Sequence, residues 1–179
     1  MLPFLNPMMN NKIRIASTVN DSIVDGPGLR FVIFTQGCLF GCFNCHNIAT
    51  WDVKGGALVE MDDLVTKWRK NPLIEGITLS GGDPLLQPEA CLYLIRKAHE
   101  TGLNVTLYSG YTYERLLVDK NEVIRTIIQE IDYLIDGPFV EAKKDLSRLY
   151  RGSYNQRFID LGATRRSGIL TLIDEVKPS

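Results

Sequence analysis

Apolar side chains recur along the chain with two different spacings, and these spacings predict alternating strands and helices. Lys12–Thr18 alternates apolar and polar residues, which is the period of a half-buried strand. Leu29–Thr35 is rich in β-branched and aromatic residues, which indicates a more buried strand. Short apolar runs predict further strands at Gly76–Ser80, Leu103–Ser109, Tyr133–Asp136 and Gly168–Ile173.

Between several of these strands, the apolar residues recur with the spacing of a helix. Met61–Lys70 opens with aspartates, which suit the N-terminus of a helix. Gln87–Thr101 places its apolar residues on one face and is followed by a glycine at the C-cap position. Tyr113–Ile131 is predicted to be mostly helical, with a break near Asp119. Beyond it, Phe139–Gly162 has a weak pattern and is expected to be rich in loops.

The order of strand, loop and helix repeats about four times, which is typical of an α/β fold with a parallel sheet and right-handed crossovers. Such a sheet is either doubly wound or part of a barrel. A full barrel of eight βα units needs about 250 residues, and the chain has 179. The length therefore favours one domain and excludes a complete barrel.

Charge and composition exclude several classes of protein. Lys and Arg number 20 against 21 Asp and Glu, so the formal net charge of −1 does not support a general binder of nucleic acid or of membrane surfaces. Apolar residues make up 45% and charged residues 23%, which argues against disorder. Residues 1–12 do not resemble a signal peptide. We therefore expect a cytoplasmic protein with reduced thiols and no membrane partner.

Three of the four cysteines lie together, directly after the second predicted strand, where βα folds place their chemistry. Cys42-x-x-Cys45-His46 matches a haem attachment motif, but that motif implies export and leaves Cys38 without a role. A thioredoxin-type pair also omits Cys38. A zinc site prefers four ligands, and adjacent residues such as Cys45 and His46 rarely reach one ion. The spacing C-x3-C-x2-C best suits a 4Fe–4S cluster with one iron open to a substrate or cofactor. Cys91, on the predicted helix, is expected to pack in the core.

This cysteine spacing, after a strand of a partial βα barrel, resembles the radical S-adenosylmethionine enzymes. In that superfamily the three cysteines bind a 4Fe–4S cluster, and the amino and carboxylate groups of S-adenosylmethionine chelate the fourth iron. One electron then cleaves the sulfonium to methionine and a 5′-deoxyadenosyl radical. The resemblance implies an incomplete, TIM-like βα barrel of parallel strands with outer helices, open on one side.

A second motif supports the resemblance. Ser80-Gly81-Gly82-Asp83-Pro84 ends the next buried strand, where the superfamily carries the loop that binds the methionine amino group. Glycines let the backbone approach a ligand, and a carboxylate suits an ammonium. Taken alone, the stretch is also compatible with an ordinary β-turn.

Three further runs resemble the glycyl radical enzyme activases: Asp25–Arg30 (DGPGLR), Gln36–Cys38 and Cys45–Asn47. Larger activases carry a cysteine-rich insert, which is absent here. The short chain and the later motifs most resemble the anaerobic (class III) ribonucleoside-triphosphate reductase-activating proteins. Those motifs are Ser109-Gly110-Tyr111, Leu134–Phe139 and Arg151–Gln156.

Some positions depart from that pattern. Asn44 stands where those activators have glycine and many superfamily members an aromatic residue, and His46 stands where they have tyrosine. His46-Asn47 and Thr50–Asp52 look more like the pyruvate formate-lyase activator, which stays an alternative. Other radical enzymes acting on a peptide or small molecule, and a non-catalytic iron–sulfur or zinc module, also stay open. We expect one domain over 1–179, with a core of about 25–161 and peripheral segments 1–12 and 163–179.

The resemblance implies an oxidoreductase that cleaves S-adenosylmethionine and abstracts a glycine hydrogen from an anaerobic ribonucleotide reductase. Its electron donor would be of the flavodoxin or ferredoxin type. The cluster ligands it implies are Cys38, Cys42 and Cys45. The implied contacts to S-adenosylmethionine are Asn44, Cys45, His46, Gly81, Gly82, Asp83, Tyr108 and Ser109.

Two features outside these motifs also bear on function. Asp136 ends a predicted strand and is a further active-site candidate. Residues 143–166 contain seven Lys and Arg against two Asp, which indicates either a solvated face or a docking surface for an acidic partner.

Overall fold

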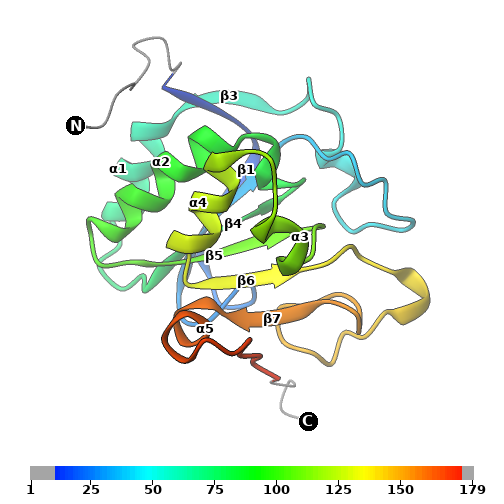
Figure 1. Cartoon of the computed structure of the whole chain (residues 1–179). Coiled ribbons are helices and arrows are strands. Elements are labelled where there is room, and N and C mark those ends of the chain that lie inside the picture. The colour runs from blue at the N-terminus through cyan, green and yellow to red at the C-terminus, as the bar shows by residue number, and fades with distance from the viewer. Residues whose placement is uncertain (1–10, 175–179) are drawn as a thin grey trace.

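The structure, a computed structural model, describes residues 11–174 and contains one mixed sheet (Figure 1). Its strand order is β3-β1-β2-β4-β5-β6-β7. Since β3 and β7 are the two outer strands of this order, the sheet does not close into a barrel. The strands are β1 (Lys12–Ser22), β2 (Arg30–Thr35), β3 (Ala57–Glu60), β4 (Gly76–Gly81), β5 (Asn104–Ser109), β6 (Tyr133–Asp136) and β7 (Arg157–Asp160).

The centre of the sheet has the predicted parallel arrangement. Strands β2, β4, β5 and β6 pair in parallel, whereas β1, β3 and β7 pair antiparallel to their neighbours. The expected open, partial βα barrel is therefore confirmed, with antiparallel strands added at both edges. The α-helices are α1 (Met61–Arg69), α2 (Pro88–His99), α3 (Tyr113–Leu117), α4 (Glu122–Glu130) and α5 (Leu161–Ser167). Short 3-10 turns lie at η1 (Ile48–Thr50), η2 (Pro84–Leu86) and η3 (Glu141–Lys143).

One face of the sheet is buried under α1, α2 and α4 (Figure 1). Alternate strand residues, such as Phe31 and Ile33 of β2, point to this face and are almost fully buried. Phe31 packs edge-on against Trp68 of α1, with ring centroids 6.0 Å apart. Burying side chains of this size stabilises the fold by about 1.5–3 kcal/mol each. The helices thus hold the sheet from one side and leave its other face for chemistry.

The opposite face carries polar side chains, among them a fully buried arginine at the start of β2. The Arg30 Nε donates to Thr78 Oγ1 at 2.7 Å, and one Nη donates to Asn104 Oδ1 at 2.7 Å. Burial lowers the pKa of Arg30 to about 10. A Cβ on Gly26 would lie 2.8 Å from Arg30 Cδ, so the DGPG turn needs glycine to pass over this side chain.

Several element boundaries differ from the sequence predictions. The predicted break in Tyr113–Ile131 is confirmed, since α3 and α4 flank it. The predicted strand Gly168–Ile173 is wrong: it forms a single bridge, between Leu172 and Ile159, because the chain leaves α5 through a left-handed turn. The four-residue strands β3 and β7 were not predicted, because such short segments show little periodicity. Within residues 11–174, no helix is long and apolar enough to cross a membrane.

Candidate functional site

The cysteine loop begins where β2 ends, and backbone hydrogen bonds clamp its two ends together. Gly37 N donates to Thr50 O at 2.7 Å, and Cys38 N donates to Trp51 O at 3.2 Å. The buried Gln36 side chain donates to Ala49 O and to Asp52 O. The loop that carries Cys38, Cys42 and Cys45 is therefore anchored on the sheet at both ends.

The three thiols of this loop line one cavity of about 520 Å³. All three are free cysteines of intermediate exposure. Burial raises the pKa of Cys38, and Cys45 Sγ accepts a hydrogen bond from Asn47 N at 3.3 Å. Within residues 11–174, no three His, Cys, Asp or Glu side chains are arranged to hold one metal ion. A cubane cluster differs from a single ion in that each thiolate binds a separate iron, and an all-thiolate donor set suits it.

Gly82, directly after β4, has to be a glycine because it packs against the base of the cysteine loop. Gly82 N donates to Thr35 O and Asp83 N donates to Gly37 O, both at 2.9 Å. A Cβ on Gly82 would lie 2.1 Å from Gly37 O, which no side chain can satisfy. The two motifs therefore fit together only because glycine stands at this position.

Asp83 is a buried carboxylate that ties the end of β4 to the end of β5. Its Oδ2 accepts hydrogen bonds from Ser109 Oγ and Gly110 N, both at 2.9 Å, and its Oδ1 accepts one from Leu85 N at 3.0 Å. Burial raises the pKa of Asp83, and this effect outweighs the three hydrogen-bond donors, which lower the pKa. A carboxylate offers about four acceptor positions. Three are used within the chain, so Oδ1 retains capacity for one further donor.

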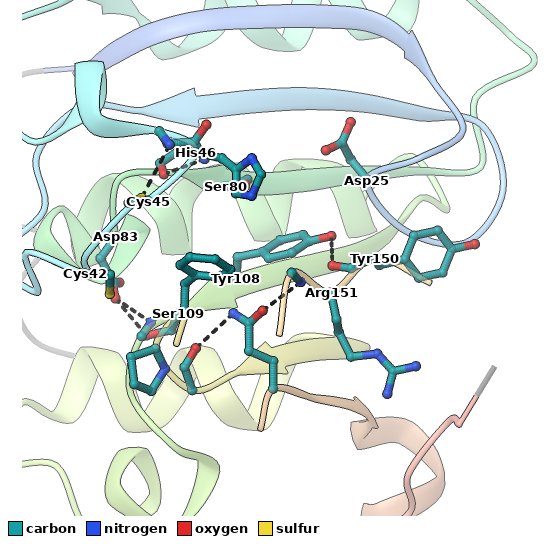
Figure 2. Close-up of a pocket in the computed structure, with 18 of the residues that line it drawn as sticks. Asp25, Cys42, Cys45, His46, Ser80, Asp83, Tyr108, Ser109, Tyr150 and Arg151 are labelled. Carbon is teal, nitrogen blue, oxygen red and sulfur yellow. Dashed lines mark hydrogen bonds between the residues drawn. The ribbon is translucent and has the colours of Figure 1, made fainter. Parts of the chain in front are cut away.

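Tyr108 and Ser109, at the end of β5, line the same cavity (Figure 2). Tyr108 donates its hydroxyl to Tyr150 O at 2.8 Å, and burial raises its pKa. The Ser109 hydroxyl is engaged by Asp83. Both side chains therefore link segments of the cavity wall.

The cavity wall also includes residues that the sequence analysis did not predict as cofactor contacts. The turn between β1 and β2 contributes Ile23, Val24 and Asp25. The long segment between β6 and β7 contributes Phe139, Arg148, Tyr150, Arg151 and Gln156, among others. The His46 ring contacts Phe139 edge-on, with centroids 5.5 Å apart. The motifs at 134–139 and 151–156 were the signal for this second wall.

Some predicted residues lie away from the cavity. Asn44 is exposed, has a left-handed φ of 53° and does not line it, so its cofactor contact stays a prediction. Asp136 is buried outside the cavity and accepts hydrogen bonds from Arg157 and from Tyr113 N. Its role in the structure is to join β6 to β7. Cys91 packs in the core, as predicted, and donates to Pro84 O at 3.2 Å.

Comparison with known proteins extends over most of the chain. Residues 24–159 match the family model described as a 4Fe-4S single cluster domain. The anaerobic ribonucleoside-triphosphate reductase-activating proteins of Salmonella typhi and Escherichia coli are 34% and 35% identical over 142 residues. Each match covers 75% of this chain and 90% of the relative.

Two further matches cover less of the chain. The pyruvate formate-lyase-activating enzyme of Clostridium pasteurianum is 39% identical over 106 residues, which is 56% of this chain and 44% of that enzyme. The solved structure of QueE from Escherichia coli covers 57% of this chain and 54% of its own, with a TM-score of 0.45 and 17% identity.

Proposed function

The chain belongs to the anaerobic ribonucleoside-triphosphate reductase-activating proteins, among the glycyl radical enzyme activases of the radical S-adenosylmethionine superfamily, and we propose that it installs a glycyl radical on a partner reductase. One observation carries the proposal: the cysteine loop and the glycine-rich loop after β4 line the same cavity and are hydrogen-bonded to each other. An iron–sulfur protein with only a structural or electron-transfer role has no need of the second loop.

In this proposal Cys38, Cys42 and Cys45 hold the 4Fe–4S cluster through their thiolates and leave one iron open. When bound, the cluster and S-adenosylmethionine supply the reductive cleavage and the radical that takes a hydrogen atom from the partner's glycine. The protein contributes position and shielding from water. The hydrogen bonds from Gly37 N and Cys38 N hold the two ends of the cysteine loop together at the end of β2.

The glycine-rich loop would receive the methionine end of S-adenosylmethionine. Asp83 has capacity for one more donor on Oδ1, which suits an ammonium group. Gly81 presents backbone at the cavity wall, and its carbonyl accepts a hydrogen bond from Asn47 Nδ2 at 3.2 Å. The remaining proposed contacts are Gly82, Asn44, Cys45, His46, Tyr108 and Ser109.

The partner and the electron donor follow from this chemistry. The hydrogen donor is a glycine in a loop of another protein, so that loop has to enter the cavity. A flavodoxin- or ferredoxin-type protein would supply the electron to the cluster. We place these reactions in the cytoplasm, where thiols stay reduced. A pyruvate formate-lyase is the alternative partner, since 106 residues of the chain are matched by its activating enzyme at 39% identity.

The test begins with anaerobic reconstitution with iron and sulfide, then reduction by dithionite with S-adenosylmethionine. We expect 5′-deoxyadenosine, and a glycyl radical by electron paramagnetic resonance when a purified anaerobic ribonucleotide reductase is added. Cys42→Ser should lose both, whereas the matched control Cys91→Ser, buried in α2, should keep them. Bound zinc without cleavage would overturn the proposal. A radical only on pyruvate formate-lyase would reassign the partner.

A further inference from the structure

The connection between β1 and β2, residues 23–29, forms part of the cavity wall, and we call it the β1–β2 turn. Its residues Ile23, Val24 and Asp25 line the cavity, and Asp25 is labelled in Figure 2. Ile23 and Val24 are 72% and 69% exposed, so the packing of their side chains does little to fix the turn. The position of the turn therefore depends on its hydrogen bonds.

Two carbonyl groups of the β1–β2 turn accept hydrogen bonds from buried side chains of the sheet. Thr78 Oγ1, on β4, donates to Asp25 O at 2.7 Å. Arg30, at the start of β2, donates from an Nη to Pro27 O at 2.7 Å. Arg30 Nε also donates to Thr78 Oγ1 at 2.7 Å, and both side chains are fully buried. Two linked side chains thus join the turn to the two neighbouring strands β2 and β4.

The guanidinium group of Arg30 is held on all sides. Arginine has five N–H donors, and Arg30 forms five hydrogen bonds, to Pro27 O, Thr78 Oγ1, Ile77 O, Asn104 Oδ1 and Asn104 O. Each of these acceptors is an uncharged oxygen atom. Burying a cation beside uncharged groups costs stability, and an apolar side chain of similar volume would cost less. Stability alone therefore does not account for an arginine at this position.

A second buried threonine lies under the same turn but does not hold it. Thr106, on β5, is paired with Thr78 in the register of the sheet and is also fully buried. A Cβ on Gly26 would lie 3.0 Å from Thr106 Oγ1, which places this hydroxyl beside the turn. Within residues 11–174, Thr106 Oγ1 has no hydrogen-bond partner. The chain thus offers a matched pair of threonines, of which Thr78 is the one bonded to the turn.

We propose that Arg30 and Thr78 are positioning residues for the protein substrate, because they hold the β1–β2 turn in the wall of the cavity where the partner's glycine meets the radical. The inference rests on the proposed function, since it assumes that the substrate is a glycine of another protein. The proposed ligands of the cluster and contacts to S-adenosylmethionine belong to other segments of the chain. Loosening the turn should therefore impair hydrogen transfer from the partner and leave cleavage of S-adenosylmethionine intact.

The test measures these two steps separately in the reconstituted protein, reduced by dithionite. Formation of 5′-deoxyadenosine without a partner reports cleavage, and the glycyl radical on a purified anaerobic ribonucleotide reductase reports hydrogen transfer. Thr78→Val removes the hydroxyl at almost constant size and should leave cleavage unchanged. It should raise the reductase concentration that gives the half-maximal rate by about two- to tenfold, the factor that one hydrogen bond contributes. Thr78→Ser keeps the hydroxyl and should restore the wild-type concentration.

Three further variants separate the hydrogen bond from general effects on folding. Thr106→Val is the matched control and should change neither step. Pro27→Gly loosens the turn without altering the core, so it should raise the same concentration even if Thr78→Val does not fold. Its control is Pro72→Gly, in an exposed turn after α1.

Hydrogen exchange of the backbone amides gives a readout that needs no partner. Val24 N donates to Ser22 Oγ at 3.3 Å, and Leu29 N donates to Glu75 Oε1 at 3.1 Å, so the turn contains two hydrogen-bonded amides. Exchange over residues 23–29 should accelerate in Thr78→Val and in Pro27→Gly, and should stay unchanged in both controls. Acceleration spread equally over the whole sheet would contradict a local role.

The outcomes distinguish this proposal from the proposed function. An unchanged half-maximal concentration in both Thr78→Val and Pro27→Gly overturns the positioning role. An equal rise in Thr106→Val, or a Thr78→Ser variant as impaired as Thr78→Val, overturns it as well. Absence of any glycyl radical with the wild-type protein refutes the proposed function instead.

Discussion

Replacing Asp83 with asparagine removes one charge at the junction of the two loops that carry the site, at almost constant size. In the wild type, Oδ2 accepts from Ser109 Oγ and Gly110 N, and Oδ1 accepts from Leu85 N. An asparagine has one oxygen and one NH₂ group. In either orientation, the NH₂ group faces a backbone N–H and leaves that buried donor without an acceptor.

The expected loss of stability follows from these contacts. A buried unsatisfied donor costs about 1–3 kcal/mol, and hydrogen bonds to a charged group contribute about 1.5–3 kcal/mol. We expect Asp83→Asn to lower the free energy of unfolding by about 2–3 kcal/mol. Ser109→Ala is the matched control, because it removes a single neutral donor and should cost about 1 kcal/mol.

Burial also gives the Asp83 effect a pH dependence. Because the pKa of Asp83 is raised in the folded chain, the folded state holds this proton more tightly than the unfolded state does. The contribution of Asp83 to the free energy of unfolding therefore grows as the pH falls from the pKa of the folded state toward the ordinary aspartate pKa. This contribution is lost as the pH rises through the pKa of the folded state. The difference between the wild type and Asp83→Asn should widen as the pH is lowered from 7 toward 4.

Urea unfolding of the full chain under anaerobic conditions, followed by the fluorescence of its two tryptophans, of which Trp68 is buried, measures both effects. With a slope of about 2 kcal/mol/M, Asp83→Asn should lower the midpoint by about 1 M. The reasoning is refuted if Asp83→Asn costs no more than Ser109→Ala, or if the difference from the wild type narrows at low pH.

Three further predictions concern residues outside the cavity. Cys91→Ala should leave the iron content per chain unchanged, because this thiol is buried in the core; loss of iron would make it a ligand. Tyr93→Phe should cost less than about 1 kcal/mol, and only at intermediate pH. The hydrogen bond from Tyr93 lowers the pKa of Asp62, so the stabilisation from this bond is lost in acid, when Asp62 is protonated. The same bond raises the pKa of Tyr93 to about 12, so the stabilisation is also lost as the pH rises from the ordinary tyrosine pKa to that value. Urea midpoints across pH test this, and a pH-independent cost would contradict it. Asp136→Asn breaks a buried pair with Arg157 and should cost about 2 kcal/mol, or about 4–8 °C in Tm by calorimetry. Its cleavage of S-adenosylmethionine per cluster should be unchanged, and a loss at full stability would make Asp136 part of the site.

The predicted core strands and helices came from local patterns, and the structure confirms them. The run Leu29–Thr35 indicated β2 because a buried central strand is apolar along its whole length. The break near Asp119 was visible in the same way. The edge strands were not visible, because β3 and β7 are four residues long and depend on pairing with β1 and β6, which are distant in sequence.

For the site, the sequence by itself determined which residues are predicted to carry the chemistry, and the tertiary structure decided how they meet. The spacing of Cys38, Cys42 and Cys45 is a local property of one loop, so it could be recognised without the fold. That Gly82 has to pack against Gly37 follows only from contacts between two strand ends. The meeting of Arg148 and Asp174 depends on where the chain returns after α5, which no local pattern encodes. Short-range spacing thus predicts the cofactor ligands, whereas long-range packing forms the cavity.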